Sequence, residues 1–391
     1  MNTYKITLTP VSRYFFGGDM TFKVEGQEKY SEQYGSYIIR SNRFPQQTSL
    51  LGMLRFLILS HDATAFSRTK NKITDPQRAQ ELIGASSFTV NDDYRENDFR
   101  CIRQLYPCFL ELKDDSGAHP LLVSPCDYGH KVEFNSGYSV SVNGQYSPLP
   151  HIPGYNPKEP PKSCYLYADK CIPESELFIE DPRIGIEKDY QGIKQADNSA
   201  LYKQIFYRLG NEKYEGKVRF AFYADTENVD LTQFNGSLVN VGGDDSKFLF
   251  EATLSEGNEK AATYASDYNH SFEEKEAVRQ NIPYKVVLLS DAYLPPVFSG
   301  IRLWSYAVSS IIPFRFLCTN VNTDNYTFRS PVILRSKKKY YLYTKGSVFF
   351  CKDEAEKEKL TTALASVPCF RQIGYNYFQL FQLNTITNIY E

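Results

Sequence analysis

Short segments in which apolar and polar residues alternate recur along this chain, and they restrict its fold more than any other property. The first segment, residues 4–9 (YKITLT), has the two-residue period of a half-buried strand and stops at Pro10. The later strand-like runs are residues 201–208, 218–223, 248–254, 284–289, 332–334 and 339–343. Runs of this length between turn residues predict β-strands.

Two segments have a helical period instead. Apolar residues recur at helical spacing behind Thr48, which we expect to be the N-cap of a helix. These residues are Leu50, Leu51, Leu54, Leu57 and Ile58. In residues 353–365, Glu and Lys alternate, which predicts a charged helix with a solvent-exposed face. Many strands and few long helices together predict an α+β fold with antiparallel sheets.

Proline residues interrupt the middle of the chain, between residues 148 and 161. Because proline fixes φ and lacks an N–H donor, this stretch predicts a linker or an extended arm and excludes a helix. A chain of 391 residues has the length of two or three domains at roughly 150 residues each. We therefore predict two domains, residues 1–155 and 156–391, with an approximate boundary in this stretch.

The sequence indicates a cytoplasmic protein without a membrane partner. No stretch approaches the roughly 18 consecutive apolar residues that cross a bilayer, and the N-terminus lacks the apolar core of a signal peptide. In a reducing compartment, the eight cysteines are expected to be free thiols. No two cysteines have the CxxC spacing and the five histidines are scattered, so we expect no metal site.

The overall charge is nearly balanced, with 44 Lys and Arg residues, 46 Asp and Glu residues and a formal net charge of −2. This argues against nonspecific nucleic-acid contacts over the whole surface but permits a local basic groove. Aromatic residues make up 15% of the chain, with 30 Tyr and 27 Phe. Most such rings fill cores, but exposed rings on strands stack unpaired bases. Rings in an interface would instead suit a protein–protein scaffold without RNA contact.

A Gly-Gly-Asp-Asp string occupies residues 242–245. It resembles the turn by which nucleotidyl cyclases and polymerase palms hold divalent metal, since Mg²⁺ prefers clustered oxygen ligands. Such a site also needs a carboxylate on a neighbouring strand, which the sequence does not assign. The alternative is a hairpin turn in which glycine adopts a positive φ. A metal-dependent cyclase or nuclease that uses Asp244 and Asp245 is therefore one enzymatic alternative.

His61 follows the first predicted helix and supports a second enzymatic alternative. It is placed to act as the general base of an RNA-processing endonuclease, but a histidine here is also typical of a cation at a helix C-terminus. The chain has no G-x-S-x-G, Walker A or G-x-G-x-x-G string. We accordingly expect neither a catalytic residue nor a cofactor.

Basic residues gather in particular segments. Arg40, Arg43 and Arg55 flank or occupy the start of the first predicted helix, where free N–H groups add to a phosphate site. Between residues 329 and 345, Arg and Lys interleave with Tyr, a composition that suits single-stranded RNA. The alternative for this segment is a solvated edge strand, because lysine on an edge prevents sheets from associating.

Several short strings occur in an order and spacing that resembles one known family. They are Phe15-Phe16-Gly17-Gly18-Asp19, Pro45 with residues 48–55, Arg183-Ile184-Gly185-Ile186, Ala200-Leu201-Tyr202 and Gly242-Gly243. The pattern is similar to that of the third subunit of the Cmr complex, a RAMP-superfamily component of type III-B CRISPR effectors. It covers roughly residues 4–255.

The resemblance implies two ferredoxin-like (RRM-like) modules with antiparallel sheets and long inserted loops. It also implies a non-catalytic role in antiviral defence, in which the subunit grips the 5′ tag of the guide RNA. Its partners would be the large polymerase-like subunit and the backbone RAMP subunits. In the family, Gly-Gly-Glu is followed by a basic residue, whereas here Asp244 replaces the Glu and the basic residue arrives late, at Lys247.

The residues and the resemblance together give a set of predicted RNA-binding residues. They are Arg40, Arg43, Thr48, Arg55, Arg183, Gly242, Gly243, Lys247, Lys338 and Tyr341.

Overall fold

The computed structural model describes residues 1–17, 20–24, 35–128, 133–142, 145–151, 163–167, 170–186, 201–255, 257, 260–264, 283–296, 305–306, 311–314, 317–319, 333–335 and 339–382. Its helices are α1 (Gln47–His61), α2 (Pro76–Ile83), α3 (Glu174–Leu177), α5 (Glu354–Ala365), α6 (Pro368–Gln372) and the 3₁₀ helix η2 (Leu231–Phe234). Strands dominate the rest, and nearly all of their pairings are antiparallel, so the predicted α+β class is confirmed.

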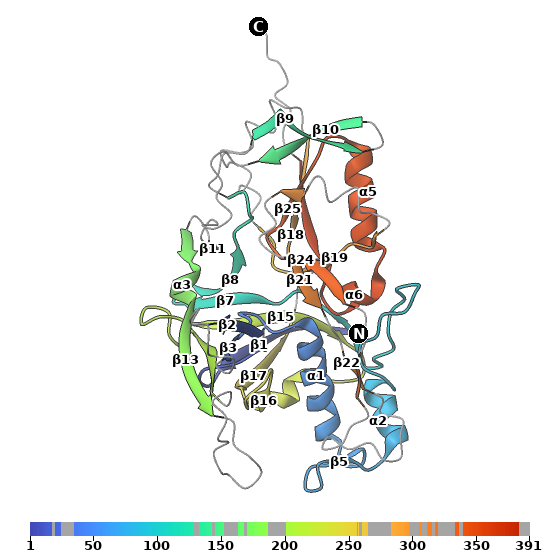
Figure 1. Ribbon diagram of the computed structural model, residues 1–391. Coiled ribbons are helices and arrows are strands. Elements are labelled where there is room, and N and C mark those ends of the chain that lie inside the picture. The colour runs from blue at the N-terminus through green and yellow to red at the C-terminus, as the bar shows by residue number, and fades with distance from the viewer. Residues whose placement is uncertain are drawn as a thin grey trace.

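A nine-stranded sheet runs through the middle of the molecule (Figure 1). Its strands are β1 (Asn2–Pro10), β6 (Ile102–Leu105), β7 (Phe109–Asp114), β8 (Gly117–Val123), β11 (Cys164–Tyr167), β12 (Lys170–Pro173), β15 (Val218–Thr226), β16 (Leu238–Asn240) and β17 (Lys247–Leu254). They lie in the order β12-β11-β8-β7-β15-β1-β17-β16, and β6 also pairs with β15. The alternating segment at residues 4–9 is the central part of β1, as its period predicts.

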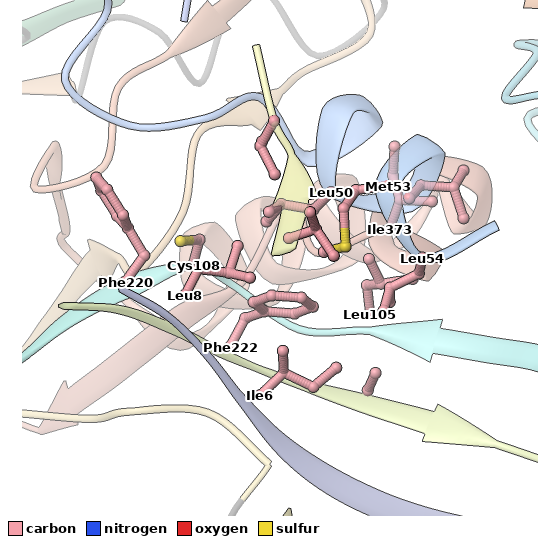
Figure 2. Packing of buried hydrophobic residues seen from close by; sticks show 14 of the residues in the cluster. Ile6, Leu8, Leu50, Met53, Leu54, Leu105, Cys108, Phe220, Phe222 and Ile373 are labelled. Carbon is pink, nitrogen blue, oxygen red and sulfur yellow. The ribbon is translucent and has the colours of Figure 1, made fainter. Parts of the chain in front are cut away.

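Helix α1 packs on one face of this sheet (Figure 2). Ile6 and Leu8 of β1 and Phe222 of β15 are at most 1% exposed, and they share one hydrophobic cluster with Leu50 and Leu54 of α1. The period of two in the strand and of about 3.6 in the helix places these side chains on the facing surfaces. Burial of these facing apolar side chains therefore holds α1 against the sheet.

The opposite face of the sheet packs against strands from the C-terminal part of the chain (Figure 1). Those strands are β18 (Tyr284–Leu288), β20 (Ser305–Tyr306), β25 (Val348–Cys351) and β26 (Phe378–Gln382), in the order β20-β25-β18-β26. Phe109 and Tyr223 of the nine-stranded sheet share a cluster with Val287 and Phe350 of these strands. Apolar side chains from two sheets thus form one continuous contact.

A second four-stranded sheet carries much of the site described below. Its strands are β2 (Met20–Val24), β3 (Gly35–Arg40), β13 (Phe178–Ile186) and β14 (Leu201–Leu209), in the order β13-β14-β3-β2. β14 and β3 pair in parallel, unlike the other neighbours. The remaining strands are β4 (Phe66–Ser67), β5 (Lys72–Ile73), β9 (Glu133–Val142), β10 (Gln145–His151), β19 (Ala292–Tyr293), β21 (Ile311–Phe314), β22 (Leu317–Thr319), β23 (Ile333–Arg335) and β24 (Tyr340–Tyr343).

The sheets do not follow the predicted division at residue 155. Strands β1, β6, β7 and β8 precede that residue, while β11, β12, β15, β16 and β17 follow it, and all belong to the nine-stranded sheet. The proline-rich stretch is extended where the structure describes it, because β10 pairs with β9, and residues 152–162 lie outside the described residues. The prolines therefore predicted the extended backbone correctly, but strands from before and after the stretch belong to one sheet.

The two predicted helices are present, as α1 and α5. Asp353 caps α5 by accepting a hydrogen bond from Glu356 N. The expected cap at Thr48 is wrong, because the N-cap residue of α1 is Gln46 and it forms no side-chain cap hydrogen bond. Buried Gln47 instead anchors this end, since its Nε2 donates to the carbonyl oxygens of Tyr106 (3.3 Å) and Gly374 (3.2 Å). Tertiary contacts replace the local cap.

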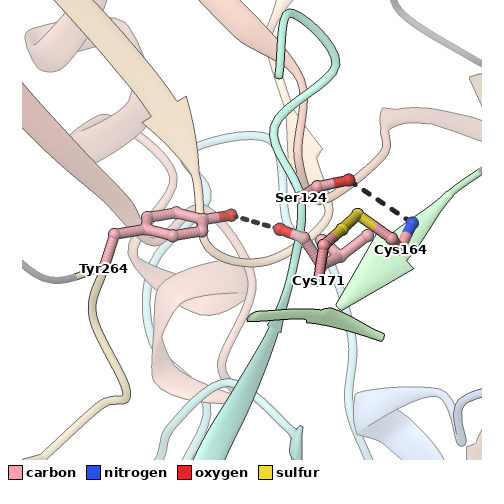
Figure 3. Close-up of a disulfide and its surroundings, with 5 residues drawn as sticks. Ser124, Cys164, Cys171 and Tyr264 are labelled. Carbon is pink, nitrogen blue, oxygen red and sulfur yellow. Dashed lines mark hydrogen bonds between the residues drawn. A yellow bond between two sulfur atoms is a disulfide. The ribbon is translucent and has the colours of Figure 1, made fainter. Parts of the chain in front are cut away.

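A disulfide joins Cys164 and Cys171, which corrects the prediction that all cysteines are reduced (Figure 3). The hairpin of β11 and β12 pairs Leu166 with Cys171 and Cys164 with Pro173, and it brings the two cysteine Cα atoms to 5.8 Å. This separation is within the range that a disulfide bridges, and strand register creates it. The structure gives free thiols at Cys101, Cys108, Cys126, Cys351 and Cys369.

Within the described ranges, no helix combines the length and the apolar character that crossing a membrane requires.

Candidate nucleic-acid interface

Segments that are far apart in the sequence meet around one pocket of about 390 Å³. The loop after β1, the end of β13, the middle of β14 and the turn between β16 and β17 all contribute to it. We call it the Arg13–Arg183 pocket, and its lining residues are Ser12, Arg13, Arg183, Ile184, Gly185, Gln204, Phe206, Asp244 and Asp245. It therefore brings Arg183 together with Asp244 and Asp245 of the Gly-Gly-Asp-Asp string.

The turn between β16 and β17 is shaped by contact with Phe15. Gly242 has a φ of +91°, and a Cβ atom there would lie 2.3 Å from the Phe15 carbonyl oxygen. Gly243 N donates to the same oxygen at 2.8 Å. Ser246 Oγ accepts from Phe15 N at 2.8 Å and donates to the Gly243 carbonyl oxygen at 2.6 Å. Close backbone approach and positive φ both require glycine at 242. Through these contacts, the string that begins at Phe15 packs against the Gly242-Gly243 string.

The two carboxylates of this turn already have partners. Asp244 Oδ2 accepts from Gln204 Nε2 at 3.1 Å, while Asp245 accepts from Asn240 Nδ2 at 3.1 Å and pairs with Lys247 at 3.0 Å. Both residues have positive φ, at 51° and 54°. The part of the chain that the structure describes contains no group of three or more His, Cys, Asp or Glu side chains that would hold a metal ion. The geometry is that of the hairpin turn.

Two arginines face this pocket, and their surroundings differ. Arg183 pairs with Asp181 at 3.0 Å, whereas Arg13 forms no ion pair with any described residue and places its guanidinium 5.2 Å from the centre of the Phe206 ring. An arginine held on an aromatic ring keeps donors available for phosphate and a planar face available for a base. Beside them, Ile184 is 78% exposed. The pocket therefore offers charge, hydrogen bonding and apolar surface to a nucleotide.

Arg40 and Arg43 lie on the other side of β14. Arg40 pairs with Glu180, and its pKa is raised by a hydrogen bond with Tyr207 and by the charge of Glu180. Arg43 pairs with Glu174 at 2.8 Å and lies 5.9 Å from the Tyr207 ring. Phe206 and Tyr207 are consecutive, so their side chains point to opposite faces of the strand. The structure does not bring Arg40 and Arg43 into the Arg13–Arg183 pocket.

Arg55 has a structural role. It is 6% exposed, and its Nε and Nη2 donate to the carbonyl oxygens of Ile83 (3.0 Å) and Gly84 (3.3 Å) at the end of α2. These bonds satisfy helix C-terminal carbonyls that would otherwise lack a partner. Thr48 lies in the first turn of α1. We do not include either residue in the interface.

The remaining predicted residues lie elsewhere. Tyr341 is on β24 and 53% exposed, and Lys338 is outside the described residues. His61 is the last residue of α1, where its Nδ1 bonds the Leu57 carbonyl oxygen at 2.8 Å and its ring lies 4.5 Å from that of Phe234. This is the helix C-terminal position that the alternative to catalysis predicted.

Sequence reasoning missed Arg13, Gln204 and Phe206. One signal was present for Arg13, because it lies two residues before the aromatic and glycine string that begins at Phe15. Gln204 and Phe206 lie within a strand run that the sequence predicts only as a strand. Only the pairing of β13 with β14, which sets Arg183 opposite Gln204, shows that they face the pocket.

Comparison with known families agrees with the pattern of strings. A family model described as CRISPR-associated protein (Cas_Cmr3) matches residues 6–382, which identifies a CRISPR-associated protein. More narrowly, the chain belongs to the Cas_Cmr3 family. The resemblance to the third subunit of the Cmr complex is therefore confirmed. No curated protein matches the chain.

Solved structures of Cmr proteins are similar at low identity. A chain from the cryo-EM structure of the Type III-B Cmr-beta bound to cognate target RNA has 13% identity and a TM-score of 0.46, covering 97% of this chain and 99% of that chain. A second Cmr-beta structure, with target RNA and AMPPnP in state 1, has a TM-score of 0.44 at the same identity and coverage. Oligomeric Cmr4 from Pyrococcus furiosus matches at 11% identity and a TM-score of 0.21, covering 66% of this chain and 100% of that chain.

Proposed function

We propose that this protein is a non-catalytic RNA-binding subunit of a type III-B Cmr effector complex. In this proposal it grips the 5′ tag of the guide RNA and links the large polymerase-like subunit to the backbone RAMP subunits. Family membership supports the assignment to the complex. Two ferredoxin-like modules, which the resemblance implies, are part of the same proposal.

One observation carries the RNA-binding part of the proposal. The string at residues 183–185 lines the Arg13–Arg183 pocket. The strings at Phe15 and at Gly242-Gly243 are joined by the hydrogen bond from Gly243 N to the Phe15 carbonyl oxygen, and they adjoin the lining residues Arg13 and Asp244. Arg13 stands there without a carboxylate partner among the described residues, which is the condition for a cation to bind an external phosphate. A few such contacts would suffice for a protein that holds one RNA end, and this agrees with a net charge of −2.

The pocket has complementary roles for its side chains. Arg13 and Arg183 would bind phosphate or stack on a base, and Gln204 would hydrogen-bond a base edge. Lys247 borders the same turn, since Val11 N donates to its carbonyl oxygen at 3.0 Å. Arg40, Arg43 and exposed Tyr341 provide further contacts only if the RNA also passes over other faces of the protein.

Affinity purification of the tagged protein from its native host tests membership of the complex. We expect small RNAs with a common 5′ end, a large polymerase-like protein and repeated backbone subunits to copurify. Recovery of the protein alone and free of RNA would overturn the proposal.

A reconstituted complex with synthetic guide RNA tests the pocket. We expect Arg13→Ala with Arg183→Ala to weaken guide binding and to make the salt slope less negative by about 1.4, at about 0.7 per phosphate contact. The control is Arg95→Ala with Lys359→Ala, which removes the same charge at exposed positions elsewhere. Equal effects of the two double variants, or no effect of the first, would refute the site assignment.

A further inference from the structure

Two hydrogen-bond acceptors without a donor belong to the lining of the Arg13–Arg183 pocket. Gln204 Nε2 donates to Asp244 Oδ2 at 3.1 Å, which directs the amide nitrogen of Gln204 towards the turn between β16 and β17. Gln204 Oε1 and Asp244 Oδ1 accept no hydrogen bond from a described residue. A ligand in the pocket therefore meets a carboxylate oxygen and an amide oxygen from two side chains that bond each other.

The neighbouring carboxylate differs, although it belongs to the same turn. Asp245 Oδ1 accepts from Asn240 Nδ2 at 3.1 Å, and its Oδ2 pairs with Lys247 Nζ at 3.0 Å. Asp244 pairs with no described cation. A positive φ alone does not account for a charge there, because asparagine tolerates this backbone as well. An unpaired carboxylate repels phosphate, so RNA gains at this position only if it brings donors to Asp244.

Strand register places the acceptors beside the two arginines of the pocket. Arg183 of β13 lies directly opposite Gln204 of β14, and the side chains of such a pair lie on one face of the sheet. Phe206 is two residues further along β14 and so lies on that face too. Arg13 holds its guanidinium 5.2 Å from the centre of the Phe206 ring. Donors and acceptors thus line one pocket in an arrangement that strand pairing fixes.

Guanine is the RNA base whose edges match both groups. Its Watson–Crick edge carries two adjacent donors, N1–H and the N2 amino group, while O6 and N7 accept from arginine. Adenine and cytosine each place an acceptor nitrogen beside their single amino group, and uracil places one N–H between two carbonyl groups. Those acceptors would face the carboxylate and be repelled. The pocket volume of about 390 Å³ is within the range of small-ligand sites.

We propose that the Arg13–Arg183 pocket selects guanine in single-stranded RNA. Asp244 and Gln204 accept from N1–H and the N2 amino group of the base. A guanidinium has five N–H donors, so the two arginines bind O6 and N7 as well as an adjacent phosphate. This inference rests on the proposed function, because it names the base that the RNA-binding pocket of that proposal takes.

Fluorescence anisotropy of the full-length protein with fluorescein-labelled heptanucleotides tests the inference. The strands are oligouridylates whose central base is guanine, adenine, uracil or hypoxanthine. We expect the guanine strand to bind about 10-fold more tightly than the adenine or uracil strand. Hypoxanthine keeps N1–H, O6 and N7 and lacks only the N2 amino group, so its strand should lose about 3-fold relative to guanine. Equal binding of the guanine and adenine strands would overturn the inference.

Two variants of the same turn form a matched pair. Asp244→Asn removes the charge at nearly unchanged size, and asparagine tolerates the φ of 51°. We expect the preference for guanine over adenine to fall from about 10-fold to about 2-fold or less. Asp245→Asn removes the same charge at a φ of 54°, but both of its oxygens already have partners. It should keep the 10-fold preference. Equal loss in both variants, or none in Asp244→Asn, would contradict the assignment.

The outcomes also separate this inference from the proposal on which it rests. If all strands bind equally and Arg13→Ala with Arg183→Ala weakens them, RNA binding at the pocket stands and guanine selection is refuted. If no strand binds the full-length protein, guanine selection is refuted, and guide binding is decided by the reconstituted complex. Unlabelled GMP distinguishes a free nucleotide from RNA as the source of guanine. We expect it to compete poorly, and displacement at concentrations equal to those of the unlabelled guanine strand would exclude RNA as the preferred ligand.

Discussion

Two constraints act on Gly242: its backbone is left-handed, and it lies against the Phe15 carbonyl oxygen. Positive φ alone strains an L-residue by about 1–2 kcal/mol. A side chain at this position would also clash, because its Cβ would lie 2.3 Å from the Phe15 carbonyl oxygen. Backbone atoms cannot move aside as the end of a flexible side chain can. Glycine at 242 is thus a packing requirement of the turn beside the pocket.

We expect Gly242→Ala to lower the free energy of unfolding by about 3 kcal/mol, as the sum of strained φ and displaced backbone. The matched control is Gly236→Ala, which has a φ of +84° and no heavy atom within 4 Å of the added Cβ. It should cost only the conformational part, about 1 kcal/mol. Urea denaturation of both variants measures the difference, and equal losses would contradict a contact-based role for Gly242.

Residue chemistry could be predicted from the sequence where it depends on neighbours in the chain. The hairpin turn at 242–245 and the C-terminal position of His61 followed from local pattern. Arg55 is different, because its donors are used by Ile83 and Gly84, which no local pattern connects to it. The sequence did contain a signal that Arg55 is buried, because Leu51 and Ile58 lie on the same side of the helix and are buried.

At the scale of elements, Asp62 organises the connection from α1 to α2. Its Oδ1 accepts from Thr64 N and Ala65 N, each at 3.0 Å, and its Oδ2 accepts from Arg78 Nε of α2 at 3.0 Å. The side-chain hydrogen bond from Thr64 and these further donors lower the pKa of Asp62 to about 2. The charged carboxylate is therefore the form that joins the two helices.

This pKa has a direct consequence for stability. Since the folded-state pKa is below the ordinary 3.8, the stabilisation is fully present above about pH 4 and is lost as the pH falls towards 2. We expect Asp62→Asn to lower the free energy of unfolding by about 1 kcal/mol at pH 7, with a smaller loss at pH 3. Denaturant titrations at both values test this, with Asp115→Asn at an exposed position as the control. A loss independent of pH would contradict the role of the charge.

The elements that could be predicted are those whose residues have a regular period along the chain. The strand at residues 4–9 and the charged helix at residues 353–365, which is α5, were both expected from the sequence. The start of α1 was not, because Gln47 is fixed by carbonyl groups of Tyr106 and Gly374, which are remote in the chain. The Cys164–Cys171 disulfide likewise depends on the register of the β11–β12 hairpin.

At the scale of the whole molecule, an ion pair as well as apolar contact joins the nine-stranded sheet to the C-terminal strands. Lys285 of β18 pairs with Asp127, which follows β8, at 2.5 Å. The two side chains are 4% and 0% exposed, so this ion pair is buried between the nine-stranded sheet and the C-terminal strands. A buried pair is costly to break one partner at a time, because the remaining charge stays desolvated.

We expect Lys285→Met to lower the free energy of unfolding by about 3–5 kcal/mol, since it leaves Asp127 charged and buried. The double variant Lys285→Met with Asp127→Leu removes both charges and should recover a large part of that loss. Chemical denaturation of the two variants and the native protein measures the coupling. A double variant that is no more stable than the single one would show that the pair does not act as a unit.

The sequence by itself determined the α+β class, the family and the turn at Gly242, because period, order of strings and backbone freedom are properties of neighbouring residues. Only the tertiary structure decided which cations are available to a ligand. Arg40 and Arg43 are paired with Glu180 and Glu174, more than a hundred positions away, while Arg13 meets no carboxylate among the described residues. Charge is neutralised through space, and strand register sets which carboxylate lies near which arginine.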